Sequence, residues 1–117
     1  MAQLDVSIQE KGMERAIVCG GEIDTSTVVT LEGAFEEAFK APATAFVVDL
    51  SSVGFIDSMG VRALVRFAKA CRERAITLRT SPSMQVRRVL DILGLVEVVG
   101  AEQPSSGTDG SVASDAD

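Results

Sequence analysis

The stretch FVVDLSSVGFIDSMGVRALVRFAKAC, residues 46–71, decides the fold. It opens with a nearly continuous apolar run, Phe46 to Leu50, which is typical of a strand buried on both faces. It ends with apolar residues at helical spacing, which predict a helix from about Met59 to Arg74 with Val61, Leu64, Val65, Ala68 and Cys71 buried. The segment therefore predicts a strand, a short connection and a helix, the repeating unit of α/β proteins.

The polar pair Asp57-Ser58 lies at the predicted start of this helix. Oxygens of such side chains accept hydrogen bonds from the unpaired N–H groups of the first turn, and these groups also give the helix start a partial positive charge. The geometry that caps the helix with Ser58 could also hold phosphate oxygens, so the chain could gain a charge of about −1.5 to −2 without unfolding. Gly60 would let the backbone of another chain come close. Two interpretations stay open here, a plain helix cap and a phosphorylation site.

The residues before this stretch predict a β-hairpin and a first helix. Alternating apolar residues at 4–8 and an apolar run at 16–19 flank a turn with one glycine, and Gly20-Gly21 ends the second strand or makes it bulge. The predicted helix begins near Val28, with a buried stripe of Val28, Leu31, Phe35, Ala38 and Phe39. Pro42 prevents it from continuing.

The residues after it predict a fourth strand at 75–78 and a third helix. Ser81 is expected to be the N-cap and Pro82 the first helical residue. The expected buried stripe is Val86, Val89, Leu90 and Leu93, and Gly94-Leu95 predicts a Schellman ending. Residues 96–99 read as a short edge strand. The predicted order is β-β-α-β-α-β-α with this last strand, an α/β fold whose sheet is mostly parallel after the hairpin.

Length and composition predict one domain, residues 1–100, followed by a tail at 101–117. The chain has 117 residues, the size of a single compact unit. The tail is rich in Gly, Ser, Ala and Asp and has one bulky apolar residue, so we expect it to be disordered. The net charge is −6, but residues 1–100 contain 13 acidic against 11 basic side chains. That near balance argues against direct DNA binding, which needs a basic excess.

Other patterns exclude several classes of function. The chain has neither a membrane-length apolar run nor a secretion signal, so we expect no membrane insertion and a cytoplasmic location. We expect Cys19 and Cys71 to be buried apolar residues with free thiols, in a protein of a reducing compartment. There is no His, so a Ser-His-Asp site is excluded, and Lys69 lies about 16 Å along the helix from Ser58. Because a phosphate-binding glycine loop and clustered metal ligands are also missing, we expect no enzyme activity, cofactor or metal.

The motif around Ser58 resembles the signature of the STAS domain family, in particular the bacterial anti-sigma factor antagonists. The resemblance rests on Asp49-Leu50-Ser51, Val53, Phe55-Ile56-Asp57-Ser58, Gly60-Val61 and Leu64, and on the earlier Gly21-Glu22-Ile23-Asp24; it covers most of residues 4–100. It implies a mixed sheet of four to five strands with helices packed largely on one face, and a Ser58 loop exposed near Asp24. Met59 departs from the small hydroxyl residue that is commoner at its position in that family.

The resemblance also implies a function: with Ser58 free, the protein binds an anti-sigma factor and releases a sigma factor. The anti-sigma factor of such systems is often itself a serine kinase that phosphorylates the antagonist and switches it off, and a PP2C-type phosphatase resets it. The expected phosphorylation site is Ser58. The expected partner-binding residues are Asp24, Thr25, Asp57, Ser58, Met59, Gly60, Arg62 and Arg66.

Three of these assignments have structural alternatives, and the function has one as well. Asp57 either orients the Ser58 loop and aids kinase recognition or only caps the helix, and Asp24 either serves as the acidic loop residue of the family or caps the first helix. The stripe Arg62, Arg66 and Lys69 is either a solvated face or a docking surface for an acidic partner. The alternative function is a non-switching STAS subunit of a sensory assembly or of a membrane-transport complex.

Overall fold

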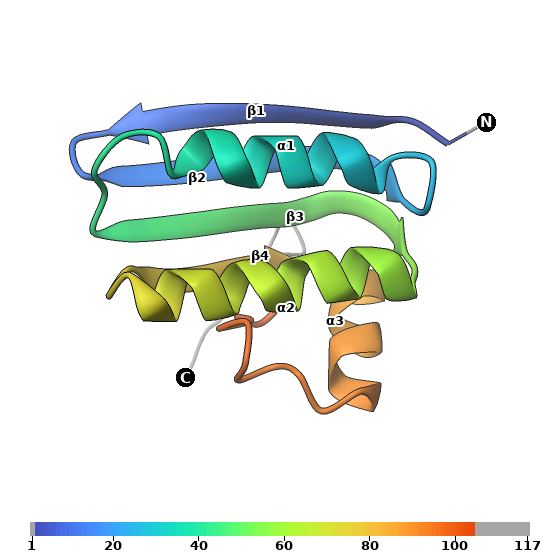
Figure 1. Ribbon diagram of the computed structural model, residues 1–117. Helices are drawn as coiled ribbons and strands as arrows, with labels where there is room; N and C mark the ends of the chain where they lie inside the picture. The colour runs from blue at the N-terminus through green and yellow to red at the C-terminus, as the bar shows by residue number, and fades with distance from the viewer. Residues whose placement is uncertain (1, 105–117) are drawn as a thin grey trace.

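The computed structural model describes residues 2–104 and has an α/β fold built on one mixed sheet (Figure 1). In chain order its elements are β1 (Leu4–Lys11), β2 (Glu14–Ile23), α1 (Val28–Ala38), β3 (Ala45–Ile56), α2 (Ser58–Glu73), β4 (Thr77–Pro82) and α3 (Met84–Ile92). The β-β-α-β-α-β-α order predicted from the sequence is confirmed. The central strand is longer than predicted, because β3 continues through Ser51–Ile56 to the start of α2.

The sheet has the order β1-β2-β3-β4. β1 and β2 form the antiparallel hairpin, whereas β2, β3 and β4 run parallel. The register between β2 and β3 shifts between Val18 and Gly20 and again between Gly21 and Glu22, and at both places the extra residue lies in β3. β2 itself continues past Gly20-Gly21 to Ile23. Because parallel strands end at the same edge of a sheet, the β2–α1 and β3–α2 connections lie side by side; we call this edge the C-terminal edge.

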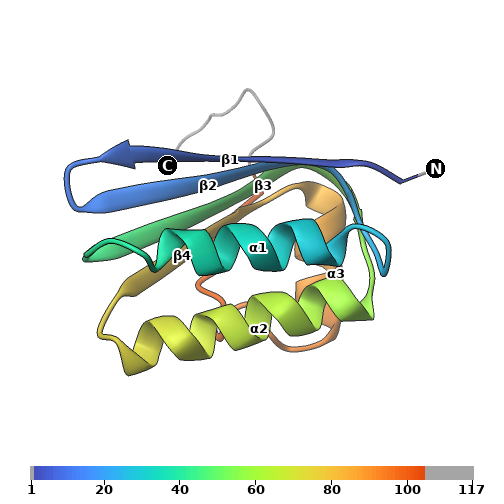
Figure 2. The same ribbon diagram turned by 45° about the horizontal axis from the view of Figure 1, so that its top comes forward.

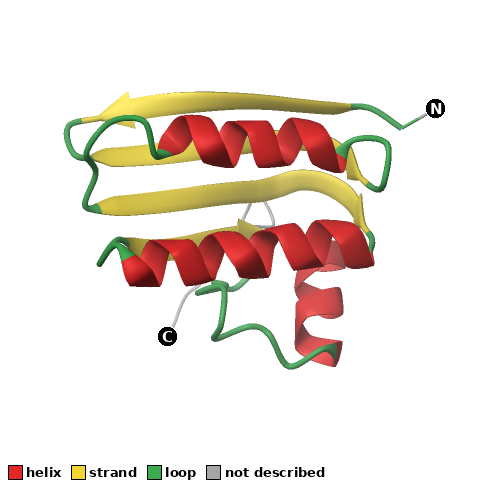
Figure 3. Ribbon diagram, in the orientation of Figure 1, coloured by secondary structure: helices red, strands yellow, loops and turns green. Residues whose placement is uncertain are grey.

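Helices α1 and α2 lie next to each other on one face of the sheet, and α3 lies near the start of α2 (Figures 2 and 3). Phe35 of α1 stacks on Phe67 of α2 with ring centroids 3.9 Å apart, and Phe67 in turn lies 5.5 Å from the ring of Phe46 in β3. This aromatic cluster joins both helices to the central strand and fixes how α2 lies over the sheet.

The buried faces of the helices differ from the prediction at a few positions. In α2, Phe67 is buried and Val65 only partly, because the face in contact with the sheet follows Gly60, Ala63, Leu64, Phe67 and Cys71. Phe39 and Val89 are also only partly buried. Leu93 was predicted to be buried but is exposed. It is the C-cap residue of α3 and therefore lies beyond the part of the helix that packs on the core.

The start of α3 is one correction to the sequence analysis. Its N-cap is Ser83 rather than Ser81, and Pro82 is the last residue of β4. The Ser83 hydroxyl accepts from the N–H of Val86 at 3.2 Å and donates to the carbonyl oxygen of Val53 at 2.6 Å. The predicted Schellman ending is confirmed: Gly94 has φ +70°, and the N–H of Leu95 donates to the Leu90 carbonyl oxygen at 2.9 Å.

The predicted edge strand at 96–99 is wrong. These residues form turns in which the N–H of Ala101 donates to the Val96 carbonyl oxygen at 2.8 Å. Val99 is fully buried, so the segment packs on the core instead of extending the sheet. A single parallel bridge, Thr80 with Ala101, remains at the edge of β4.

Part of the predicted tail contacts the domain. Glu102 pairs with Arg79 at 3.2 Å and accepts from the Ser81 hydroxyl at 3.1 Å. Residues 105–117 lie outside the described residues, so the disorder expected there stays a prediction.

Cys19 and Cys71 are buried and free, and burial raises the pKa of their thiols to about 12 and about 11, respectively. They are therefore apolar core residues, as predicted. In residues 2–104, no helix is both long enough and apolar enough to span a membrane.

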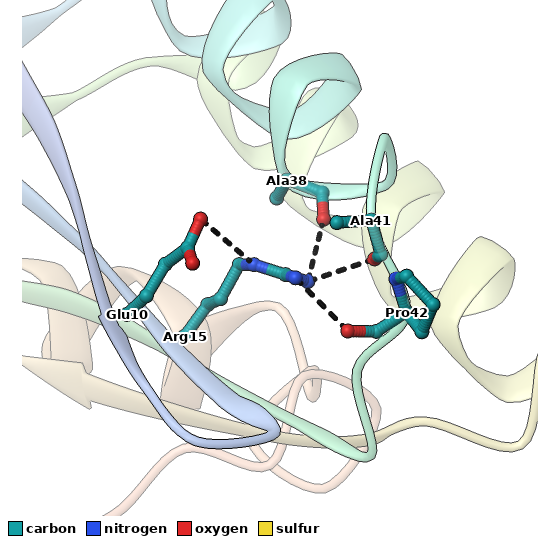
Figure 4. A network of polar contacts seen from close by, with 5 residues as sticks. All are labelled: Glu10, Arg15, Ala38, Ala41 and Pro42. Carbon is teal, nitrogen blue, oxygen red and sulfur yellow. Dashed lines mark hydrogen bonds and ion pairs between the residues drawn. The ribbon is translucent and has the colours of Figure 1, made fainter.

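A buried arginine holds the far end of α1, opposite the C-terminal edge (Figure 4). The side chain of Arg15 in β2 is 6% exposed, and its guanidinium donates to the carbonyl oxygens of Ala38, Ala41 and Pro42 at 3.1, 2.9 and 2.9 Å. Its Nε lies 3.6 Å from Glu10, which is 67% exposed. The cation thus satisfies carbonyl groups at the end of α1 and fixes the turn that leads into β3.

We expect Arg15→Met to lower the free energy of unfolding by about 2–3 kcal/mol, because it removes charge-assisted hydrogen bonds to buried and partly buried carbonyl groups. Glu10→Gln should cost less than about 1 kcal/mol, because an ion pair with an exposed carboxylate contributes little. Urea unfolding followed by circular dichroism measures both. An equal loss in the two variants would mean that the ion pair, and not the carbonyl contacts, stabilises this end of the fold.

Candidate functional site

The two connections at the C-terminal edge are tied together by the backbone. The N–H of Asp57, between β3 and α2, donates to the carbonyl oxygen of Ile23, the last residue of β2, at 3.0 Å. The predicted loops around Asp24 and Ser58 are therefore neighbours in the fold, at the right-hand end of the sheet in Figure 1. The parallel pairing of β2 with β3 brings them together.

Asp57, not Ser58, caps α2. One carboxylate oxygen of Asp57 accepts from the N–H groups of Met59 and Gly60 at 3.0 and 3.1 Å, and its backbone carbonyl accepts from Val61 at 3.0 Å. Ser58 is the first helical residue. The structure thus shows the capping role that was considered for Asp57. The prediction that Ser58 caps the helix is wrong, because the cap is the residue before it.

Ser58 and Met59 are exposed on the first turn of α2. The next residue, Gly60, is buried where the helix meets the strand ends. A Cβ atom at Gly60 would lie 2.5 Å from Ile23 Cγ2 and 2.7 Å from Ile56 Cγ1. Gly60 therefore serves the close approach of α2 to its own sheet, and this packing supports the exposed position of Ser58.

The β2–α1 connection is a turn organised by Asp24. Its Oδ1 accepts from the N–H and the hydroxyl of Ser26 at 2.9 and 2.7 Å and from the N–H of Thr27 at 3.2 Å. The hydrogen bond from the Ser26 hydroxyl is the main cause that lowers the pKa of the Asp24 carboxyl below its usual value, so the group carries a negative charge at neutral pH. Thr27 is the N-cap residue of α1 and makes no side-chain cap of its own. Asp24 thus shapes the turn before α1, and Thr25 is exposed on it.

Arg62 and Arg66 lie on the exposed side of α2 at increasing distance from Ser58. Arg62 is four residues from Ser58, which places it one turn away on the same face. Arg66 is two turns away, about 12 Å along the axis, and lines a shallow groove between α1 and α2 with Glu32 and Glu36. The structure therefore brings Arg62, but not Arg66, next to Ser58.

Two exposed apolar residues near this edge were not predicted as part of the site. Phe55, at the end of β3, is 49% exposed, and Met84, the first residue of α3, is 58% exposed. Ser83 holds the start of α3 against β3 through its bond to Val53. The signal for Phe55 was available, because it falls on the outward side of a strand whose next residue, Ile56, is buried.

The hydroxyl of Ser58 lies on the surface at this edge. Ser58 makes no side-chain hydrogen bond with any residue of 2–104 that could serve as its base. The same range holds no group of three or more Cys, Asp or Glu arranged to bind a metal ion. The exposed hydroxyl can accept a covalent group from another protein, and the residues around it can contact a partner.

The model of the STAS domain family matches residues 5–108 of this chain. This match agrees with the sheet order, the two neighbouring loops and the exposed Ser58. The chain belongs to the STAS domain family. A relative from Mycobacterium tuberculosis, the anti-sigma-F factor antagonist RsfB, is 28% identical over 92 residues, which are 79% of this chain and 75% of RsfB.

Solved STAS structures share the fold. A crystal structure of an anti-sigma factor antagonist from Mycobacterium paratuberculosis has a TM-score of 0.79 at 21% identity and covers 90% of both chains. Unphosphorylated SpoIIAA, described as a Bacillus cell fate determinant, has a TM-score of 0.71 at 21% identity and covers 88% of this chain and 90% of its own. SpoIIAA has also been solved in its phosphorylated form, which matches with a TM-score of 0.66. At these identities the likeness establishes the α/β fold with its four-stranded mixed sheet.

We expect Gly60→Ala to lower the free energy of unfolding by about 1–3 kcal/mol, because the new methyl group must displace Ile23 or Ile56. Gly33→Ala, in the exposed part of α1 with no atom within 4 Å of the new Cβ, is the matched control. It should raise the free energy of unfolding by about 0.5–1 kcal/mol. Denaturant unfolding measures both; wild-type stability in Gly60→Ala would contradict the close approach.

Proposed function

We propose that this protein is an anti-sigma factor antagonist whose binding surface is the C-terminal edge and whose switch is phosphorylation of Ser58. In the unphosphorylated form it binds an anti-sigma factor and so releases a sigma factor for transcription. The single observation that carries the proposal is the exposed hydroxyl of Ser58 on the first turn of a rigidly held helix. The antagonist relative RsfB supports the partner class.

The surface has the composition of a protein contact. Exposed Met59 and Phe55 supply apolar area, and methionine adapts its shape to a partner. Asp24 and Thr25 contribute polar groups from the neighbouring turn, and Arg62 and Arg66 extend the surface along α2 with positive charge. Such charge would steer an acidic partner toward this face.

Phosphorylation would act on this surface without changing the fold. The kinase transfers the γ-phosphoryl group of ATP to Ser58 Oγ, which loses its proton, and ADP is released. The product carries about −1.5 to −2 charges next to Asp57 and near the Asp24 turn, both of which are acidic. Burying this group unpaired in an interface costs several kcal/mol, and about 1.4 kcal/mol already weakens binding tenfold. Local electrostatics and desolvation therefore suffice for the switch.

The proposed partners follow from this cycle. The anti-sigma factor is itself the serine kinase, and a PP2C-type phosphatase hydrolyses phosphorylated Ser58 to restore the hydroxyl and inorganic phosphate. The protein acts by binding, in the cytoplasm where sigma factors act. Asp57, beyond its observed role as a cap, presents Ser58 to the kinase.

The test is to titrate purified anti-sigma factor kinases of the source organism against four forms of the full chain. We expect wild type and Ser58→Ala to bind with the same affinity, and Ser58→Asp and site-specifically phosphorylated Ser58 to bind at least tenfold more weakly. The same kinases with ATP should phosphorylate wild type and not Ser58→Ala, as read by mass spectrometry.

Thr77→Asp is the matched control, because Thr77 is exposed at the start of β4, at the opposite end of the sheet. It adds the same charge and should leave the affinity unchanged. Equal binding by all forms, with no phosphate on Ser58, would sink the switch and favour a non-switching STAS subunit of a sensory or transport assembly.

A further inference from the structure

Three of the backbone N–H groups in the first turn of α2 already have acceptors. The N–H groups of Met59 and Gly60 both donate to the carboxylate of Asp57, and the N–H of Val61 donates to its carbonyl oxygen. A phosphoryl group on Ser58 would have to displace this cap to use them, which would destabilise the start of α2. A side chain that reaches Ser58 could bind the phosphate and leave this cap intact.

Arg62 is the cation placed to be that partner. It lies one turn beyond Ser58 on the exposed face of α2, where side chains at i and i+4 have Cβ atoms about 5–6 Å apart. Helical side chains point back toward the N-terminus, so a long side chain at Arg62 extends over Ser58 and not away from it. The spacing thus places Arg62 within reach of the proposed modification site.

Arg62 is also free to take this role. Arg15, Arg79 and Arg87 each form an ion pair with a carboxylate of residues 2–104. Arg62 forms none with any residue in that range and is exposed. Its guanidinium can therefore turn to a new anion without breaking an existing contact.

We propose that Arg62 binds the phosphoryl group of phosphorylated Ser58 within the same chain, an inference that rests on the phosphorylation of Ser58 in the proposed function. The planar guanidinium matches two phosphate oxygens with two parallel N–H donors. Arg62 is then a positioning residue with two states. It faces a partner when Ser58 is free and is held by the phosphate when Ser58 is modified.

The inference is tested on the full chain carrying phosphoserine installed at position 58 during synthesis, with neither kinase nor partner present. A ³¹P NMR titration measures the second pKa of the phosphate, which is ordinarily about 6. A neighbouring cation favours the doubly charged form, so Arg62 lowers this pKa. Arg62→Gln should raise it by about 0.3 unit relative to the otherwise unchanged phosphoprotein.

Arg66→Gln is the matched control, since it removes the same charge one turn further from Ser58 and should raise the pKa far less. Arg62→Lys keeps the charge but not the two parallel donors, so it should give a phosphate pKa between those of the unchanged phosphoprotein and Arg62→Gln. The charged groups of neighbouring elements, Glu22, Asp24, Asp57 and Arg88, are the same in every variant.

Equal shifts in the two glutamine variants, or no shift in Arg62→Gln, would overturn the contact. These readouts do not depend on a binding partner, so they stay interpretable if the anti-sigma factor titration fails. Conversely, a discriminating partner together with an unshifted phosphate pKa would support the switch and reject the role of Arg62.

Discussion

The close packing of the first turn of α2 against the ends of β2 and β3 is the constraint on which the rest of the site depends. Gly60 leaves no room for a side chain beside Ile23 and Ile56, and the N–H of Asp57 is bonded to the carbonyl oxygen of Ile23. The aromatic contacts of Phe67 with Phe35 and Phe46 hold the same helix further along its length. A helix fixed at two places cannot rotate to bury or expose Ser58, so the presentation of this hydroxyl is a property of the fold.

The sequence predicted the order of the elements because apolar periodicity is visible within each segment. The nearness of the Ser58 loop to Asp24 was implied by the resemblance to the STAS family, and the parallel pairing of β2 with β3 explains it. The predictions from the sequence were wrong where the structure depends on the path of the backbone at single residues. Asp57 and Ser58 are both good caps, and only the path of the chain out of β3 decides that Asp57 takes the N–H groups. Residues 96–99 alternate like a strand, yet Val99 is drawn into the core by the turns that follow α3.

The contacts of Arg15 are of a kind that the sequence does not predict. A basic residue at the start of a strand ordinarily lies on the surface, and the three carbonyl groups that receive its guanidinium are 23 to 27 residues away. Such a contact has no local signature in the sequence. It holds the end of the fold opposite Ser58, so the two ends have different roles: a buried cation closes one, and exposed polar and apolar side chains form the other.

The distances of the charged groups from Ser58 determine how a switch at this residue would work. On the proposed function, modification adds negative charge at Ser58 and, through Arg62, withdraws positive charge from the same turn. Both changes fall within one turn of α2, about 5 Å, which is shorter than the screening length of about 8 Å at physiological ionic strength. Arg66 and Lys69 lie about 12 and 16 Å from Ser58 along the helix, so they keep their charge exposed in both states.

A partner that depended only on these distant bases would not sense the modification. Discrimination therefore requires that the partner cover the first turn of α2, where Ser58, Met59 and Arg62 are exposed beside the half-buried Asp57 and the neighbouring Asp24 turn.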